Sequence, residues 1–161
     1  MIPLLRLVAA AGLVAAALAT ASTSAQARTP FTTIGGTWAG SGSARLSSGE
    51  TERLRCRAYY NPKSGGSRMG LAIRCASAGN KIELRSQLNY ANGLVSGNWT
   101  ETNFNASGSL TGRARPGRIS LTIRGGLTGS LTLSFGRGSQ TVSLRTSTTS
   151  LRSVNISLSR R

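Results

Sequence analysis

The sequence is poor in the side chains that perform acid–base and metal chemistry. It has no His and no Asp, and its only carboxylate side chains are four Glu, at positions 50, 52, 83 and 101. A general base that works near neutral pH is most often His, and a zinc site needs three or four His, Cys or carboxylate ligands. Glu50 and Glu52 fall on one strand face, but a chain with such short loops offers no substrate cleft for a carboxylate pair. We therefore expect a protein that is not an enzyme and that needs neither a metal nor a cofactor.

Aromatic residues are equally scarce, with two Trp, three Tyr and three Phe in 161 residues. Proteins that bind single-stranded nucleic acid stack bases on aromatic side chains, and no RNA-recognition signature is present. Nucleic acid is therefore not an expected partner. An outer-membrane barrel, which would place Leu and Ile outward and Arg in a lumen, remains an alternative, although it normally carries aromatic girdles.

The shortage of acids leaves a large positive charge. Twenty Lys and Arg face four Glu, a formal net charge of +16. Only Lys63 and Lys81 are Lys, and a GC-rich genome would favour Arg in this way, but codon bias does not explain why acids are scarce. The imbalance therefore predicts contact with an anionic partner.

The first 27 residues are expected to be a signal peptide. Arg6 precedes an apolar run from Leu7 to Leu18, and Ala25-Gln26-Ala27 fits a signal-peptidase site. The run is too short to cross a bilayer as a helix, and an uncleaved anchor is the alternative. We expect residues 28–161 to form one periplasmic or secreted domain without a transmembrane helix, and its oligomeric state stays open.

Alternation with a period of two dominates residues 28–161, and no helical stretch stands out. Ile34, Gly36 and Trp38 begin one such segment, and Gly-rich turns recur about every ten residues. Further alternating segments contain L54-C56-A58-Y60, M69-L71-I73-C75, I82-L84-S86-L88, I119-L121-I123, L127-G129-L131-L133-F135 and V154-I156-L158. This pattern predicts an all-β fold, an antiparallel up-and-down meander of about 8–10 strands closed or nearly closed into a small barrel.

The two cysteines, Cys56 and Cys75, are expected to form a disulfide. In an exported protein two cysteines usually make a structural bridge, and the eighteen intervening residues do not fit a C-x-x-C redox pair. A bond across a hairpin would place Tyr60 opposite Leu71, with a loop from Lys63 to Arg68. We expect this bridge to staple the second strand to the third.

The same register gathers Arg side chains on the outer face of the sheet. Arg57 and Arg74 become cross-strand neighbours, and a turn at Ala78-Gly79 would place Glu83 beside Arg74. One guanidinium group can donate two parallel hydrogen bonds to a phosphate or carboxylate, so this face is a candidate anion-binding patch. The alternative is a face that is only solvated. The candidate anion-binding residues are Arg53, Arg55, Arg57, Arg74 and Arg85.

A resemblance to known families rests on the element Gly36-Thr37-Trp38, which Gly97-Asn98-Trp99 repeats. A Gly-x-Trp on the first strand of an antiparallel meander resembles the calycin families, among them the lipocalins and avidins. The segment GTWAGSG, followed by RLRCRA, also resembles small exported bacterial β-barrel proteins of unknown function. The calycin resemblance implies that Trp38 closes the barrel base, and Trp99 becomes a second barrel-closing or ligand-lining residue. No long lid loop is present, and the polar side chains with which avidin contacts its ligand cannot be placed on this chain.

Three functions fit these expectations. The leading one is a non-catalytic envelope protein whose Arg face binds an anionic surface or polymer, such as lipopolysaccharide, anionic lipid or acidic polysaccharide. A second is a lipocalin-like carrier of a small apolar ligand, in which Trp38 and Trp99 line or close the lumen. A third is an inhibitor of a secreted enzyme. Whether the inward Leu, Ile and Val fill the barrel or line a lumen is left open.

Overall fold

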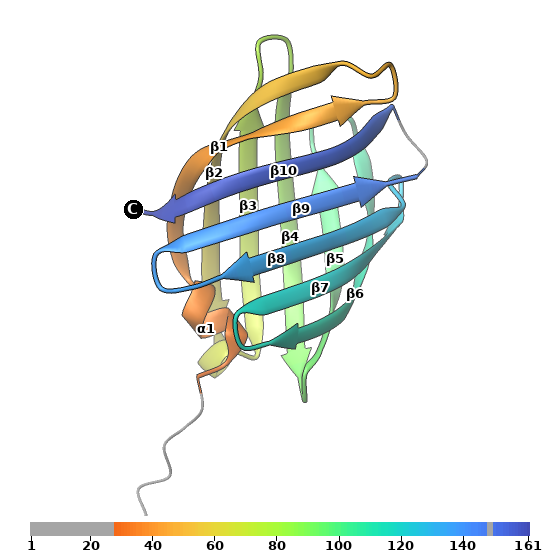
Figure 1. Cartoon of the computed structure of the whole chain (residues 1–161). Coiled ribbons are helices and arrows are strands. Elements are labelled where there is room, and N and C mark those ends of the chain that lie inside the picture. The colour runs from red at the N-terminus through yellow and green to blue at the C-terminus, as the bar shows by residue number, and fades with distance from the viewer. Residues whose placement is uncertain (1–27, 148–149) are drawn as a thin grey trace, which may run out of the picture.

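The computed structural model describes residues 28–147 and 150–161, so the expected signal peptide, 1–27, lies outside the described residues. Ten antiparallel strands form a closed barrel, as predicted (Figure 1). The elements in chain order are α1 (Pro30–Ile34), β1 (Gly36–Leu46), β2 (Thr51–Lys63), η1 (Ser64–Gly66), β3 (Arg68–Ala76), β4 (Lys81–Ala91), β5 (Leu94–Glu101), β6 (Ala106–Arg115), β7 (Arg118–Gly125), β8 (Gly129–Phe135), β9 (Ser139–Thr146) and β10 (Leu151–Arg160). Within those residues we find no helix with the length and hydrophobicity needed to cross a bilayer.

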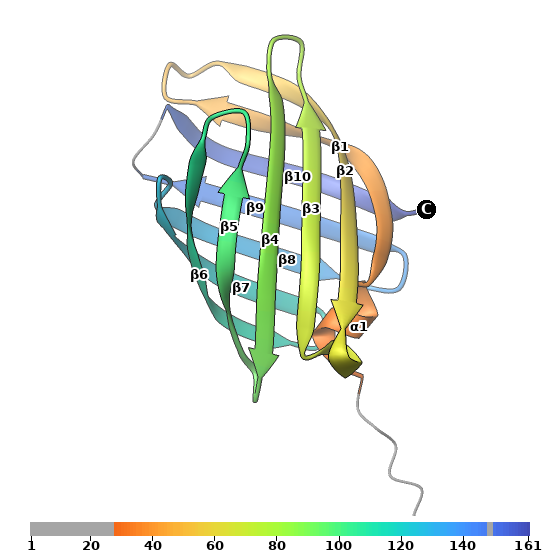
Figure 2. The same ribbon diagram turned by 180° about the vertical axis from the view of Figure 1, so that it is seen from behind.

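Each strand pairs with its neighbour in the sequence, and β1 pairs with β10 to close the ring. Successive turns therefore alternate between the two ends of the barrel. One end, here called the α1 end, carries α1 and the turns β2–β3, β4–β5, β6–β7 and β8–β9 (Figures 1 and 2). The other end, here called the far end, carries the turns β1–β2, β3–β4, β5–β6, β7–β8 and β9–β10.

Alternation along each strand separates an apolar interior from a basic exterior. In β2, Leu54, Cys56 and Ala58 are buried, while Arg53, Arg55 and Arg57 are exposed. A shift of the pairing by one residue would turn the Arg side chains into the interior, so burial sets the register. Apolar side chains face inward and Arg side chains outward, the reverse of the arrangement that a membrane-spanning barrel requires.

The segment before the first strand differs from expectation, because Ile34 lies in a short helix rather than in a strand. Thr29 accepts a hydrogen bond from the Thr32 backbone N–H at the start of α1, and Pro30 occupies the first turn. Phe31 and Ile34 are fully buried, and the Phe31 ring lies 5.7 Å from that of Tyr90. This single helical turn closes the α1 end. Its five residues are too few to show a helical pattern in the sequence.

The glycines of β1 allow that strand to bend. An added Cβ at Gly40 would lie 2.0 Å from the backbone oxygen of Ser157, and one at Gly42 would lie 2.1 Å from that of Asn155. Only a residue without a side chain permits such close approach between strands. Gly40 and Gly42 therefore mark a bend in this strand.

The predicted disulfide is confirmed. Cys56 and Cys75 face each other across β2 and β3, with Cα atoms 4.1 Å apart. The register also places Tyr60 opposite Leu71 and Lys63 opposite Arg68. The bond closes a loop with a sequence separation of 19 residues. In the chain-entropy model such a crosslink stabilises the folded state by about 3 kcal/mol.

Candidate anion-binding site

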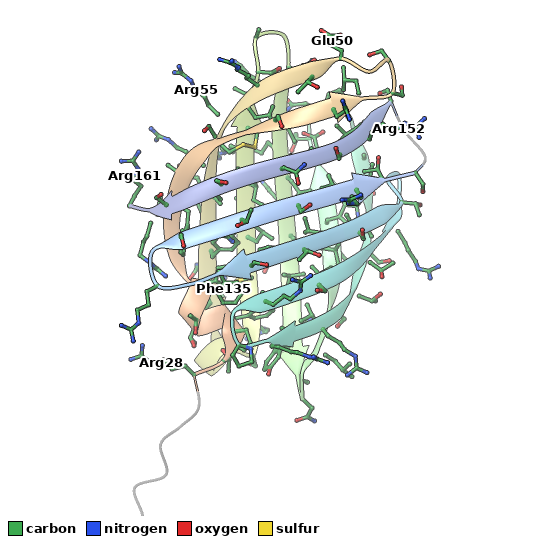
Figure 3. The ribbon with its side chains drawn as sticks, viewed as in Figure 1. Arg28, Glu50, Arg55, Phe135, Arg152 and Arg161 are labelled. Carbon is green, nitrogen blue, oxygen red and sulfur yellow. A yellow bond between two sulfur atoms is a disulfide. The ribbon has the colours of Figure 1, made fainter. Side chains whose placement is uncertain are left out.

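The structure brings the five candidate cations onto the outer wall formed by β2, β3 and β4. Arg57 lies opposite Arg74, and Arg74 lies opposite Glu83, as the register predicted. All five guanidinium groups are exposed, and Figure 3 shows Arg55 projecting from the wall. These residues are Arg53, Arg55, Arg57, Arg74 and Arg85.

Glu83 neutralises part of this patch. Its Oε1 accepts hydrogen bonds from Arg85 Nε at 2.9 Å and Arg85 Nη2 at 2.6 Å, and Arg74 Nη2 lies at 3.3 Å. The hydrogen bonds from Arg85, followed by that from Arg74, lower the pKa of the Glu83 carboxyl below its ordinary value. Arg74 and Arg85 are therefore already paired with Glu83. Arg55 and Arg57 do not pair with Glu83 and are better placed to bind an external anion.

A hollow of about 690 Å³ opens over this wall. Arg55, Arg57 and Arg74 line it, and so do Lys81 and the last residue, Arg161. Arg53 and Arg85 lie on the adjoining wall. The floor and sides are completed by Ala39, Gly40, Ser41, Cys56, Cys75, Ala76, Ile82, Glu83 and Asn103. We call these lining residues the basic hollow.

Lys81 and Arg161 were missed by the sequence reasoning. Lys81 faces Ala76 directly after the β3–β4 turn, so the hairpin pattern was enough to place it on the same face as Arg55. Arg161 enters from the other end of the chain, where its backbone N–H donates to the Thr37 carbonyl at 3.0 Å. Only barrel closure brings Arg161 to the wall, and no local sequence pattern could have predicted this position.

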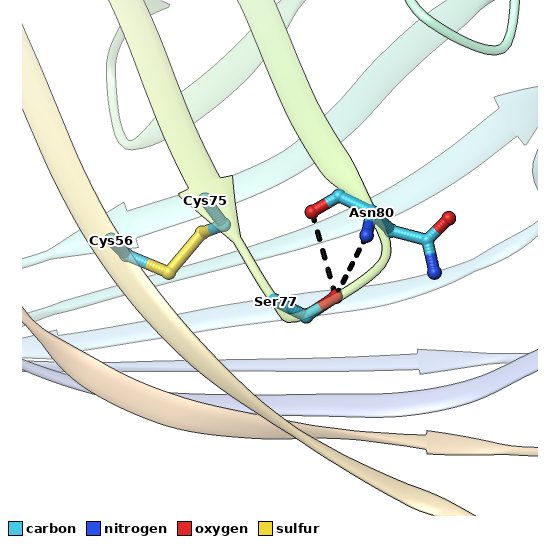
Figure 4. The surroundings of a disulfide bond; sticks show 4 residues. All are labelled: Cys56, Cys75, Ser77 and Asn80. Carbon is cyan, nitrogen blue, oxygen red and sulfur yellow. Dashed lines mark hydrogen bonds between the residues drawn. A yellow bond between two sulfur atoms is a disulfide. The ribbon is translucent and has the colours of Figure 1, made fainter.

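The turn that positions Lys81 is held by its own side chains (Figure 4). Asn80 N–H donates to Ser77 Oγ at 3.1 Å, and Ser77 N–H donates to the Asn80 carbonyl at 2.9 Å. Asn80 Nδ2 also donates to the Glu52 carboxylate at 3.2 Å. Together with the adjacent disulfide, these hydrogen bonds fix the conformation of the turn at the edge of the basic hollow.

Trp38, expected to close the barrel, lies at the α1 end. Its side chain is fully buried, and its Nε1 donates to the Ile34 carbonyl at 2.9 Å. Trp99 lies elsewhere, in the wall of β5, where it is 3% exposed and its Nε1 donates to the Arg124 carbonyl at 3.3 Å. A shallow hollow of about 510 Å³ lies outside this wall, between Asn98, Ser109 and Arg124.

One polar pair is buried inside the barrel near the α1 end. Gln140 Nε2 donates to the Tyr60 hydroxyl at 2.8 Å, and Gln140 Oε1 has no protein partner among the described residues. Burial raises the pKa of the Tyr60 phenol strongly, and the hydrogen bond from Gln140 opposes this only in part. The phenol therefore stays neutral and is a fixed polar feature in an apolar interior.

The inward side chains at the far end are less covered than those at the α1 end. The half-buried aliphatic residues there pack on the core, but solvent still reaches them; they are Ile82, Leu84, Ala106, Leu127, Leu131, Leu144 and Leu151. At the α1 end, Met69 and Ile119 are 1% exposed. The barrel interior is therefore sealed at one end and partly accessible at the other.

No group of three or more His, Cys, Asp or Glu that could hold a metal ion occurs in residues 28–147 and 150–161. The buried Glu101 has a structural role. Its carboxylate accepts hydrogen bonds from the backbone N–H of Phe104 at 2.6 Å and of Glu83 at 2.8 Å. This arrangement organises the β5–β6 turn.

Comparison with known proteins locates the fold but not the function. No protein-family model and no curated protein sequence matches the chain. Among solved structures the fold is similar to that of Rv2717c from M. tuberculosis, with a TM-score of 0.60 and 12% sequence identity, over 80% of this chain and 92% of that one. The similarity shows a shared small β-barrel fold.

Proposed function

We propose that this protein is an exported, non-catalytic binding protein of the cell envelope, whose basic hollow holds an anionic surface or polymer. The observation that carries the proposal is the meeting of Arg55, Arg57, Lys81 and Arg161 at one hollow in which Glu83 is the single acidic side chain. A disulfide fits the oxidising compartment that export implies.

The chemistry of the hollow suits phosphate or carboxylate groups. The guanidinium groups of Arg55 and Arg57 present planar donor pairs that match both anions. Three of the lining residues, Gly40, Cys56 and Cys75, carry no charge, so a repeating unit of a polymer can lie against them while its own charges reach the surrounding cations. Glu83 is occupied by Arg74 and Arg85, so no free base is available for catalysis at this place.

The test is binding to polyphosphate and to polygalacturonate over a range of salt concentrations. Affinity should fall steeply with salt, because binding a polyanion releases counterions. R55Q/R57Q/K81Q should weaken binding and reduce the salt slope by about one for each cation that no longer meets an anionic group. The matched control, R45Q/R145Q/R152Q, removes the same charge elsewhere and should bind like the native protein. Equal losses in both variants would mean that total charge, rather than the hollow, governs binding.

A second candidate function is a carrier of a small apolar ligand, and the half-buried aliphatic residues at the far end favour it. Leu131 and Leu144 face each other there and point inward, yet remain accessible. The calycin resemblance of Gly36-Thr37-Trp38 belongs to the same proposal, with Trp38 at the sealed base. A neutral apolar dye such as Nile red should gain fluorescence with the protein at high salt. L144E should abolish the gain, and the outward T141E should preserve it.

A further inference from the structure

The acidic residues are unevenly distributed along the barrel axis. Every Glu of the chain lies toward the far end: Glu50 in the β1–β2 turn, Glu52 at the start of β2, Glu83 near the start of β4 and Glu101 at the end of β5. Because the chain has no Asp, the α1 end carries no acidic side chain. The cations at the α1 end are not among the residues that line the basic hollow.

The α1 end carries a ring of exposed cations. They come from the residue that leads into α1 and from the β2–β3, β6–β7 and β8–β9 turns with their flanking strand ends; they are Arg28, Lys63, Arg68, Arg113, Arg115, Arg118 and Arg137. We call them the α1-end ring. Figure 3 shows Arg28 at this end of the molecule and Glu50 and Arg152 at the other.

One turn at this end lacks a cation and carries an exposed aliphatic side chain instead. Leu94 begins β5 directly after the β4–β5 turn and is 54% exposed. It lies opposite Arg113 in the β5–β6 pairing. The α1 end therefore combines a cationic rim with a projecting apolar side chain.

We propose that the α1 end is a docking face for an anionic lipid bilayer. Ten strands spaced about 4.8 Å apart and tilted by about 40° give a barrel about 20 Å across, so the ring surrounds a broad end. A linear polymer would follow a stripe, whereas a flat bilayer reaches cations on several turns at once. Lipid phosphates attract such cations, and Leu94 enters the interfacial region beside them. Docked in this way, the barrel turns its far end toward the aqueous phase.

The experiment uses residues 28–161, the expected exported form. Binding is measured to vesicles that contain both phosphatidylglycerol and phosphatidylcholine, and to vesicles of phosphatidylcholine alone. The native protein should bind the anionic vesicles and lose binding at high salt. Since each cation near such a surface contributes about fivefold, R115Q/R118Q/R137Q should lower affinity by about 100-fold. R45Q/R145Q/R152Q removes three exposed cations at the far end and should change affinity much less.

Orientation is measured with two variants that each add one exposed Trp to the buried native pair, Trp38 and Trp99. The fluorescence of L94W should shift to shorter wavelength on anionic vesicles, because the indole leaves water. F104W places the same reporter at an exposed position of the far-end β5–β6 turn, where Phe104 is 62% exposed, and its emission should not shift. A shift in F104W alone would reverse the proposed orientation and overturn the inference.

Two other results would overturn it: no binding of the native protein to anionic vesicles at low salt, or equal losses in the two triple variants. Neither result depends on the basic hollow. R55Q/R57Q/K81Q tests the hollow with soluble polymers, so the two proposals succeed or fail separately. Vesicle binding lost in that variant but kept in R115Q/R118Q/R137Q would assign the lipid to the hollow and refute docking through the α1 end.

Discussion

The guanidinium group of Arg160 lies over the ring of Trp38, with its Cζ 4.4 Å from the ring centroid. The same group donates from Nη1 to the Gly35 carbonyl at 2.6 Å and from Nη2 to the Thr33 carbonyl at 2.8 Å. Its Nε donates to the Arg137 carbonyl at 3.2 Å. The last strand thus locks the first strand, the end of α1 and the β8–β9 turn together.

Arg160→Gln should destabilise the fold because it removes the stacked cation and its charge-assisted hydrogen bonds to three backbone carbonyls. We expect a loss of about 2 kcal/mol in the free energy of unfolding. Urea denaturation followed by tryptophan emission measures it. Arg145→Gln, at an exposed position of β9 near the far end, is the matched control and should unfold at the native urea concentration. Native stability in Arg160→Gln would show that Trp38 closes the α1 end without this partner.

Cys56→Ala/Cys75→Ala should fold into the same barrel with a lower stability. The crosslink restricts the unfolded chain, so its loss should cost about 3 kcal/mol. The measurement is urea denaturation of native and variant protein with and without reductant. Reductant should shift the midpoint of the native protein toward that of the variant and leave the variant unchanged. An insensitive native protein would contradict the staple.

Because the Tyr60 phenol is buried, we expect the protein to lose stability at alkaline pH. Burial raises the pKa of its phenol above the ordinary value of 10.0. Below pH 10 the phenol is neutral in both states, and its contribution to stability is complete. As the pH rises above 10, the unfolded chain ionises first, so the free energy of unfolding falls by about 1.4 kcal/mol per pH unit for this group.

The measurement is the urea midpoint of native protein and Tyr60→Phe between pH 8 and pH 11.5. Tyr60→Phe removes the titrating group, so the difference between the two proteins should shrink as the pH rises. At pH 8 the variant should be the less stable, because the buried Gln140 Nε2 loses the hydroxyl to which it donates. A constant difference across the range would contradict a neutral, buried phenol.

Gly40→Ala should destabilise the barrel by about 1–3 kcal/mol or prevent its closure, because the added Cβ would overlap the Ser157 carbonyl of β10. Gly79→Ala is the matched control, since nothing lies within 4 Å of its added Cβ in the β3–β4 turn. Thermal unfolding of both variants compares them. A Gly40→Ala protein as stable as the native one would mean that β1 does not need its close approach to β10.

Much of the fold is encoded in short stretches of sequence. The alternation in β2 and β3, the Gly and Asn in the turns and the position of the two Cys were enough to predict the hairpin register and the disulfide. The same pairing placed Arg57 beside Arg74 and Glu83 beside Arg74. These relationships are local, because a hairpin brings together residues that are close in the sequence and strand alternation decides which face they share.

Other features depend on contacts between distant parts of the chain. Arg160 reaches Trp38, Arg161 reaches the basic hollow, and Gln140 reaches Tyr60 only after β1 and β10 have paired. The helical turn at Pro30–Ile34 forms because Phe31 and Ile34 find a barrel end to fill, and five residues are too few to form a stable helix alone.

The charge pattern lies between these cases. The meander and its alternating turns were predictable, and they place Arg115, Arg118 and Arg137 at the end opposite Glu50. What closure added is the ring itself, because turns far apart in the sequence become neighbours around one barrel end. Sequence alone determined the strands, their faces and the staple, since these follow from local geometry and burial. The tertiary structure decided which charges from distant parts of the chain share a surface, since that depends on how the sheet closes.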